Sequence, residues 1–382
     1  MAPLERAVRS TKDQEISPTQ ILPIENRRYI PARLMRRKFH FSELLQSSIS
    51  QTELALVEMN AGCASKQEIE AMTRSMIRAE SIASSRIAGQ ALVTRRILRA
   101  ELEMNLVGDT LDQCANEVLS NIHALSYGIC QIREGSEITI DLISKIHELI
   151  TSAKNDAGCF ALPSSPDLDE LMADLILFCN RDDLPAVAQA AIAQAQLETI
   201  RPFAEGNGRT ARVLAQLILR RRGLALKVLP PVSLVVANQR KQFKTGHSSN
   251  QNVGKCKSTP ASSNLNSWIE IFSYSCNKSI AEAMQFQRQL ALIERGWRKK
   301  LGYVRDDCTI DLLLQRLTGV PVLSVTSAMK IINRNLPVTS AALSLLVSNG
   351  ILTEINLSAR NRAFEAPEII TAFTKMEKTL VN

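Results

Sequence analysis

Aromatic residues, histidine and long apolar runs are all scarce in this chain of 382 residues. Aromatic side chains make up 4% of it, too few to supply the base-stacking surface of a single-strand nucleic-acid binder. No uncharged apolar run reaches the roughly 18 to 20 residues that cross a bilayer, and charged residues interrupt the N-terminal segment. We therefore expect neither a membrane span nor a secretory signal, and we predict a cytoplasmic protein.

Sets of metal-ligating residues are also lacking. The eight cysteines include no pair at C-x2-C spacing, and the four histidines lie far from one another in the sequence. This spacing excludes a zinc frame and a disulfide framework of the usual kinds. Because most of the cysteines have apolar neighbours, we predict buried, reduced thiols in a reducing compartment.

The composition that remains suits folded domains. Hydrophobic residues make up 45% of the chain and charged residues 22%, and the length favours two or three domains. The net charge of +8 is concentrated, because residues 211–305 hold 17 Lys and Arg against three acidic residues. Two interpretations of this basic segment stay open. It could attract phosphate groups, nucleic acid or acidic proteins, or it could be a solvated helical face.

Apolar residues at helical spacing predict a mainly α fold. Such stretches cover residues 41–59, 66–87, 91–103, 111–132, 138–152, 167–180, 184–197, 213–219 and 265–300. Residues 1–20 lack periodicity and are predicted to be a tail, and residues 245–264 are predicted to be a loop. Strand signal is nearly absent from this part of the chain.

From residue 309 onward the pattern changes to short elements. We predict helices at 309–317, 325–333 and 337–349, followed by strands at 351–355 and 363–364 around a polar turn. Two successive helices followed by two strands around a turn is the order of a winged helix-turn-helix.

A glycine-rich turn, Glu-Gly-Asn-Gly at residues 205–208, joins two predicted helices and is followed by Arg209 and Arg212. Backbone N–H groups at such a helix N-terminus, at the positive end of the helix dipole, bind phosphate. The two arginines lie three residues apart and share a helix face near this terminus. Glu205 could hold a magnesium ion that bridges the phosphate oxygens. The pattern fits a polyphosphate nucleotide, and the competing interpretation is an ordinary helix N-terminus with arginines paired to surface acids.

These residues resemble the loop motif of the Fic (Fido) family, H-x-F-x-[D/E]-G-N-G-R-x-x-R. Seven of its eight defined positions match, at Phe203, Glu205, Gly206, Asn207, Gly208, Arg209 and Arg212. The resemblance divides the chain into four parts. They are a tail (1–20), an N-terminal helical region (21–90), a Fic-like core (91–300) and the winged helix (309–375).

The resemblance implies a protein adenylyltransferase, which uses magnesium to transfer AMP from ATP to a hydroxyl side chain of a target protein. It assigns the phosphates to the three residues of the Gly-Asn-Gly turn and to both arginines, and the metal to Glu205. A weaker part of it places Asn238 and Phe243 near the adenine, with a structural role as the alternative. The target protein cannot be named from the sequence.

The unmatched motif position is the family's catalytic histidine, the general base, where this chain has Arg201. A guanidinium group stays protonated at physiological pH and cannot accept the proton of an attacking hydroxyl group, whereas histidine can. Base catalysis of this kind typically supplies about 10²- to 10⁴-fold in rate. The resemblance therefore implies ATP binding with impaired or lost AMP transfer.

Two further departures accompany the first. Residues 84–89, Ser-Ser-Arg-Ile-Ala-Gly, resemble the family's inhibitory helix, but Ala88 replaces the glutamate that pairs with the second motif arginine. We therefore expect no autoinhibition through Arg212, which would lack an internal acid partner and be open to an external phosphate. Residues 151–167 are too short and too poor in β-branched residues for the family's β-hairpin flap, which aligns the target by strand addition.

Three functions follow as hypotheses. The first is an impaired Fic-like protein that binds ATP and magnesium, and the second is a transferase that uses another base or moves another phosphate-bearing group. The third is a DNA-binding or scaffolding protein that acts through its winged helix. The candidate recognition helix at 337–349 contains no Lys or Arg, so protein contact or a homodimer competes with DNA. In the wing, only Arg360 and Arg362 suit phosphate contact.

Overall fold

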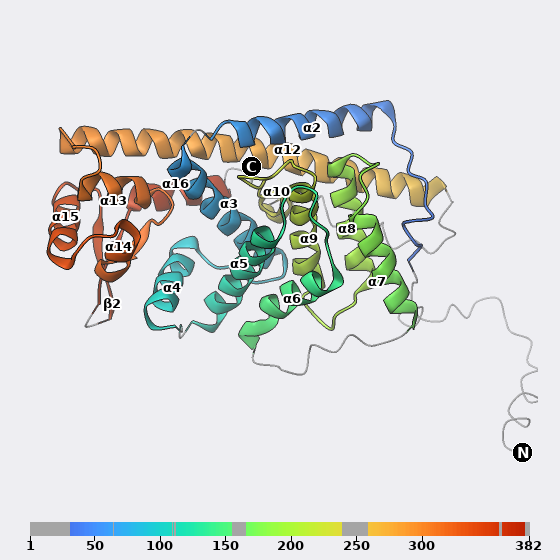
Figure 1. The fold of residues 1–382 in the computed structure, drawn as a ribbon, viewed down its shortest axis with the longest axis horizontal. Coiled ribbons are helices and arrows are strands. Elements are labelled where there is room, and N and C mark those ends of the chain that lie inside the picture. Colours follow the sequence, from blue (N-terminus) through green and yellow to red (C-terminus); the bar gives the residue numbers. More distant parts are fainter. Residues whose placement is uncertain are drawn as a thin grey trace, which may run out of the picture. The chain divides into compact units, whose positions relative to one another are not determined.

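A computed structural model describes residues 31–63, 65–108, 110, 112–154, 166–238, 259–358 and 361–378. This part of the chain is mainly α-helical, as the apolar spacing predicts, and its strands all lie beyond residue 321 (Figure 1). The predicted tail, residues 155–165 of the flap region and most of the predicted loop lie outside the described residues. The loop prediction was wrong at its end, because the long helix α12 (Thr259–Leu301) already begins there.

The N-terminal helices begin at serine caps. The hydroxyl of Ser42 accepts from the N–H of Leu45 at the start of α2 (Glu43–Ala61), and Ser65 caps α3 (Lys66–Ile87) in the same way. Helix α2 packs along α12, and α3 packs against α5. The helices that follow are α4 (Thr94–Val107), α5 (Gln113–Gln131), α6 (Ile140–Thr151) and α7 (Pro166–Cys179).

The centre of the core is a pair of helices, α8 (Ala186–Ile200) and α9 (Asn207–Arg221), which pack against each other. Helix α8 is rich in alanine and almost entirely buried, and a helix that is apolar on all sides belongs in a core. Small alanine side chains let α7, α9 and α12 pack closely around it. Trp268 of α12 donates its indole N–H to the carbonyl of Ala191 in α8 at 2.8 Å. This hydrogen bond ties α12 to α8.

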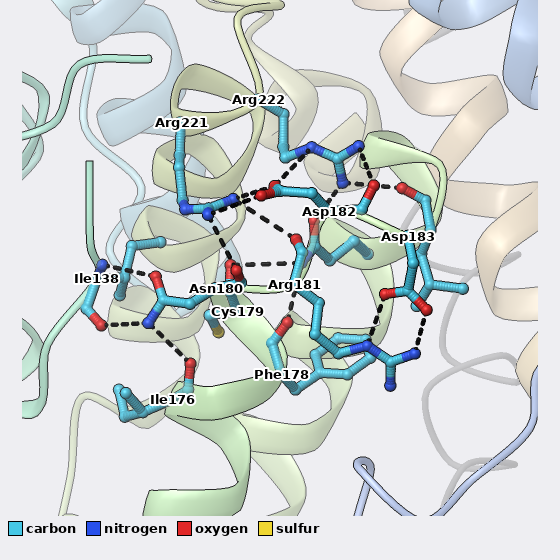
Figure 2. A network of polar contacts seen from close by, with 12 residues as sticks. Ile138, Ile176, Phe178, Cys179, Asn180, Arg181, Asp182, Asp183, Arg221 and Arg222 are labelled. Atoms are coloured by element: carbon cyan, nitrogen blue, oxygen red, sulfur yellow. Dashed lines mark hydrogen bonds and ion pairs between the residues drawn. The ribbon is translucent and has the colours of Figure 1, made fainter. Parts of the chain in front are cut away.

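A network of polar contacts anchors the C-terminal end of α9 (Figure 2). The Asp182 carboxylate lies between two guanidinium groups, 2.6 Å from Nη1 of Arg221 and 3.3 Å from Nε of Arg222. Arg221 also donates to the carbonyl of Asn180, and Arg222 donates to the carbonyl of Leu184. Cations are favoured at this end of a helix because of its dipole. These arginines of the basic segment are thus used within the fold.

The cysteine prediction was only partly right. Cys63, Cys179 and Cys276 are buried free thiols, whereas Cys114 and Cys130 are exposed. The two exposed residues lie in the first and last turns of α5, where a helix end meets solvent. Burial raises the pKa of the Cys179 and Cys276 thiols, which keeps them protonated.

The C-terminal module, residues 309–378, contains a three-stranded antiparallel sheet of order β1-β3-β2. Strand β3 pairs with β1 at Leu323↔Phe364 and with β2 at Ile355↔Ala363. The module comprises α13 (Thr309–Leu317), β1 (Val322–Ser324), α14 (Val325–Ile332), α15 (Leu336–Ser348), β2 (Thr353–Ser358), β3 (Asn361–Glu365) and α16 (Pro367–Lys378). The predicted helices are found, and the assignment as a winged helix stays a prediction.

Helix α16 was not predicted. It buries Ile370, Phe373 and Met376 and packs against α12, where Phe373 meets Phe286 edge to face at 5.8 Å. Its apolar face is short and had no partner that the sequence identified.

In the described ranges, no helix combines the length and apolar character that a membrane span requires.

Candidate functional site

The loop between α8 and α9 is closed by its asparagine. The Asn207 side chain accepts from the N–H of Phe203 at 3.0 Å and donates to the carbonyl of Phe203 at 2.7 Å. Gly206 caps α9 with φ of 74°, a left-handed conformation that glycine adopts without strain. The first N–H groups of α9 follow directly and have no acceptor within the helix.

A Cβ atom at either glycine of the turn would contact a neighbouring side chain. A Cβ atom at Gly208 would lie 3.1 Å from Nη1 of Arg212, and one at Gly206 would lie 3.4 Å from the His147 ring. Neighbouring side chains therefore fill the space beside both glycines. A residue without a side chain lets a ligand approach main-chain N–H groups closely.

Arg209 lies in the first turn of α9 and is 6% exposed. Within the described part of the chain, its Nη1 is buried and has no hydrogen-bond partner. Burial lowers the pKa of the Arg209 guanidinium, and the charges of Glu117 and Glu205 oppose that shift. Buried donors are nearly always paired, and leaving one unpaired costs about 1–3 kcal/mol. A phosphate oxygen at this helix end would supply the missing acceptor.

Arg212, by contrast, has internal partners. Its Nε donates to Ser84 Oγ at 2.7 Å, and its Nη2 donates to the Ser84 carbonyl at 3.0 Å. Its Nη1 lies 4.0 Å from a Glu198 carboxylate oxygen, so the expectation that Arg212 lacks an internal acid partner was wrong. Ser84 precedes Ala88 by one turn of α3, and Glu198 lies in the last turn of α8. The loss of an acid at position 88 therefore does not leave this guanidinium without one.

Arg201 is exposed at the C-terminal end of α8, with its N–H donating to the carbonyl of Leu197 at 3.0 Å. Its φ of 51° is left-handed, which is uncommon for a residue with a side chain. A cation suits the negative end of a helix dipole. Of the other histidines that the sequence could not place, His123 is exposed on α5, and His247 lies outside the described residues.

His147 lies beneath the loop, where the sequence could not place it. Its ring stacks on Phe203 with centroids 3.7 Å apart, and its Nε2 lies 3.0 Å from the Glu205 carbonyl oxygen. Since that oxygen can only accept, Nε2 carries the hydrogen. Burial lowers the pKa of His147, which the hydrogen bond to Glu205 opposes and the charge of Arg209 reinforces. The ring is 1% exposed, so it supports the loop and cannot receive a proton from an incoming hydroxyl group.

Glu80 is a buried acid behind Arg212. Its carboxylate accepts from the N–H of Ser233 at 2.8 Å and from the Ser233 hydroxyl at 2.5 Å, which ties α3 to α10 (Val232–Asn238). Burial raises the pKa of Glu80 to about 7, although Ser233, Arg212 and Gln216 all favour the charged form. The ionised carboxylate therefore costs stability in the folded chain.

We expect Glu80→Gln to remove a pH-dependent loss of stability. The folded pKa of about 7 lies above the ordinary value of 4.5. The contribution of Glu80 to the free energy of unfolding is therefore fully present below pH 4.5 and is lost as the pH rises through the folded pKa of about 7. The free energy of unfolding falls by about 3 kcal/mol over this range. Thermal unfolding at about pH 5 and about pH 8.5 measures it, and an equal difference between wild type and variant at both pH values would contradict this expectation.

Among the described residues, no three His, Cys, Asp or Glu side chains gather into a metal-binding cluster. Magnesium commonly takes one or two carboxylates and completes its shell with water and substrate phosphates. The single carboxylate of Glu205, partly buried beside the Gly-Asn-Gly turn, fits that requirement. Asn238 donates its amide N–H to the carbonyl of Glu377 at 2.8 Å, and Phe243 lies outside the described residues.

The part of the chain that contains this loop is similar to known proteins. The model of the Fic/DOC family matches residues 131–219, from the end of α5 through most of α9, and so includes the whole loop. This part of the chain is therefore similar to a Fic domain. The protein adenylyltransferase fic-1 of Caenorhabditis briggsae is 32% identical over 171 residues, which cover 40% of this chain and 32% of the relative. Protein adenylyltransferase Fic of Nematostella vectensis is 33% identical over 156 residues, 37% of this chain and 35% of the relative.

The chain thus spans about a third of the length of the curated relatives it matches. Among solved structures, a Fic family protein from Desulfovibrio desulfuricans G20 has a TM-score of 0.50 at 18% identity, covering 86% of this chain and 97% of that one. Fic-1 from C. elegans has a TM-score of 0.50 at 21% identity, covering 64% and 73%. At these identities the likeness shows the fold, which is the mainly helical fold of Fic proteins.

Sequence reasoning missed three residues that shape this site. Ser84 and Glu198 hold Arg212, and His147 supports the loop from behind. Ser84 lies within the segment that resembles the inhibitory helix, and Glu198 lies three residues before Arg201, so proximity in the sequence was a usable signal for both. His147 had no such signal, because only the packing of α6 against α9 brings it under the loop.

Proposed function

We propose that this Fic domain binds ATP with magnesium and that its transfer of AMP to protein hydroxyl groups is impaired. The observation that carries the proposal is the buried, unpaired Nη1 of Arg209 at the N-terminus of α9. A cation that is desolvated at a helix N-terminus favours an anion with several acceptor oxygens. The similarity to protein adenylyltransferases supports ATP as the source of those phosphates.

The residues of the chain have distinct parts in this proposal. The first N–H groups of α9 and Arg209 bind phosphate oxygens, and Ser84 orients Arg212 toward the same helix end. Glu205 would hold magnesium, which when bound offsets the negative charge of the phosphates. AMP transfer forms a bond from the target hydroxyl oxygen to the α-phosphorus, breaks the bond to the β-phosphate and releases pyrophosphate. The hydroxyl proton needs an acceptor, which Arg201 cannot provide.

Incubation of the wild-type chain with α-labelled ATP and magnesium in a lysate tests both parts. We expect label to be retained as bound nucleotide and to be released on denaturation, because binding is intact and covalent transfer is slow. Label that stays on a protein after denaturation would contradict the impaired transfer. A chain that retains no label in either form would contradict nucleotide binding.

A protein contact through α15 is a second candidate function. Helix α15 exposes Leu336, Val338 and Leu345, which are 55%, 46% and 42% exposed, and it carries no charged residue. DNA recognition relies on cations and hydrogen-bond donors at this position. In the wing, Arg362 is engaged by Glu354 in a two-bond ion pair, and Arg360 lies outside the described residues. These features favour a protein partner over DNA.

A further inference from the structure

The last helix of the chain places a buried acid against the elements that frame the site. Glu377 of α16 is 5% exposed, and its carboxylate lies 3.3 Å from Nη2 of Arg86 and accepts from the Thr94 hydroxyl. Its carbonyl oxygen accepts from the Asn238 amide at 2.8 Å. One residue therefore joins α16 to α3, α4 and α10.

These contacts go beyond what packing requires. Helix α16 already buries Ile370, Phe373 and Met376 against its neighbours. Burying a carboxylate is costly unless it is paired, and its polar partners then define one position for the helix. Burial raises the pKa of Glu377, and the contacts with Thr94 and Arg86 oppose the shift.

Two of these partners lead directly to the candidate site. Arg86 lies in the last turn of α3, two residues after Ser84, which makes two hydrogen bonds to Arg212. Asn238 is the last residue of α10, whose Ser233 is bonded to Glu80 of α3. Glu377 therefore contacts α3, whose Ser84 bonds Arg212, and α10, whose Ser233 bonds Glu80 behind that guanidinium.

We propose that Glu377 is a positioning residue of the nucleotide site. Glu377 fixes the C-terminal ends of α3 and α10. Ser84 of α3 therefore keeps Arg212 pointed at the N-terminus of α9. The C-terminal module thus takes part in ligand binding without touching the ligand. This inference rests on the proposed function, since it concerns binding of the same nucleotide.

The test compares Glu377→Gln with the matched control Glu365→Gln in the full chain. Glu365 is another buried acid of the module, but its partners Arg95 and Arg99, at 3.4 Å and 3.2 Å, both lie on α4. Calorimetric titration with ATP and magnesium gives the Kd of each variant, hydrogen exchange reports on residues 84–88, and thermal unfolding gives each Tm. We expect both variants to lose stability. Only Glu377→Gln should bind ATP about fivefold more weakly. This change follows when the fraction of the chain in the ATP-binding conformation falls to about a fifth.

Faster exchange at residues 84–88 in Glu377→Gln alone is the second expected result. Unchanged ATP affinity in Glu377→Gln, or an equal loss in both variants, would overturn the inference. If the wild-type chain binds no ATP, the proposed function fails. The exchange comparison then still decides whether Glu377 holds α3, and equal exchange in wild type and Glu377→Gln would refute that contact on its own.

Discussion

Replacing Arg201 by histidine is expected to raise AMP transfer by about 10²- to 10⁴-fold, the usual contribution of a positioned general base. An imidazole at this position would accept the hydroxyl proton that a guanidinium cannot. The backbone accommodates the change, because residue 201 has φ of 51° and histidine is among the residues that adopt this region more readily. Covalent incorporation of label from α-labelled ATP, with magnesium and a lysate as the source of targets, measures the gain.

Arg201→Lys is the matched control for this experiment. It keeps a positive charge at the end of α8 but adds no base at physiological pH. The lysine variant should transfer no more AMP than the wild type. Equal covalent labelling by the wild type, the lysine variant and the histidine variant would contradict the account, because the working base would then lie elsewhere.

Replacing Arg209 by glutamine is expected to weaken binding of ATP with magnesium by about 10- to 100-fold. The variant loses a charge-assisted contact with phosphate, which is worth about 1.5–3 kcal/mol when one partner is charged. Glutamine retains some hydrogen-bonding capacity and fits the space of a 6%-exposed side chain. Calorimetric titration of both chains with ATP in the presence of magnesium measures the difference.

Arg222→Gln controls for the loss of charge. Arg222 caps the opposite end of α9, where it contacts Asp182 and Leu184 rather than the loop. This variant should unfold at a lower temperature and bind ATP as the wild type does. A similar loss of affinity in the Arg209 and Arg222 variants would indicate a general effect of charge and would contradict a phosphate contact at Arg209.

The helices were predictable to the extent that their own residues determine them. Helix α3 covers residues 66–87, as apolar spacing predicts, because that signal is local. Helix α16 was not predicted, because its stability comes from contact with α12, to which Phe373 contributes. The short helix α10 escaped prediction for a similar reason, since its Ser233 is held by Glu80 of α3, far away in the sequence.

More of the loop between α8 and α9 than of the residues around it could be predicted from the sequence. Gly206 has the positive φ that a glycine before a helix indicates, and Asn207 closes the turn with its own side chain. The partners of Arg212 could not be derived, because Ser84 lies 128 residues away and reaches it only through the packing of α3 against α9. The loop motif therefore indicated which residues gather at the N-terminus of α9. It did not indicate that Arg212, rather than Arg209, forms hydrogen bonds within the protein.

The division of the chain into functional parts stays a prediction at its C-terminal end. The module from residue 309 has the helices and the antiparallel sheet that its pattern indicates, yet its α15 carries no charge for DNA. Its last helix contacts the end of α3 through Glu377 instead. This contact is the one on which the proposed positioning role of Glu377 rests.

Calorimetric titration of the wild-type chain with ATP and magnesium is the most direct test of the central claim. The account predicts saturable binding at one site, because Arg209 and the N-terminus of α9 form a single phosphate-binding position. Removing magnesium should weaken that binding, since Glu205 then meets the phosphates without a cation between them. A titration without detectable binding at millimolar ATP, with the chain folded by its thermal transition, would contradict the account.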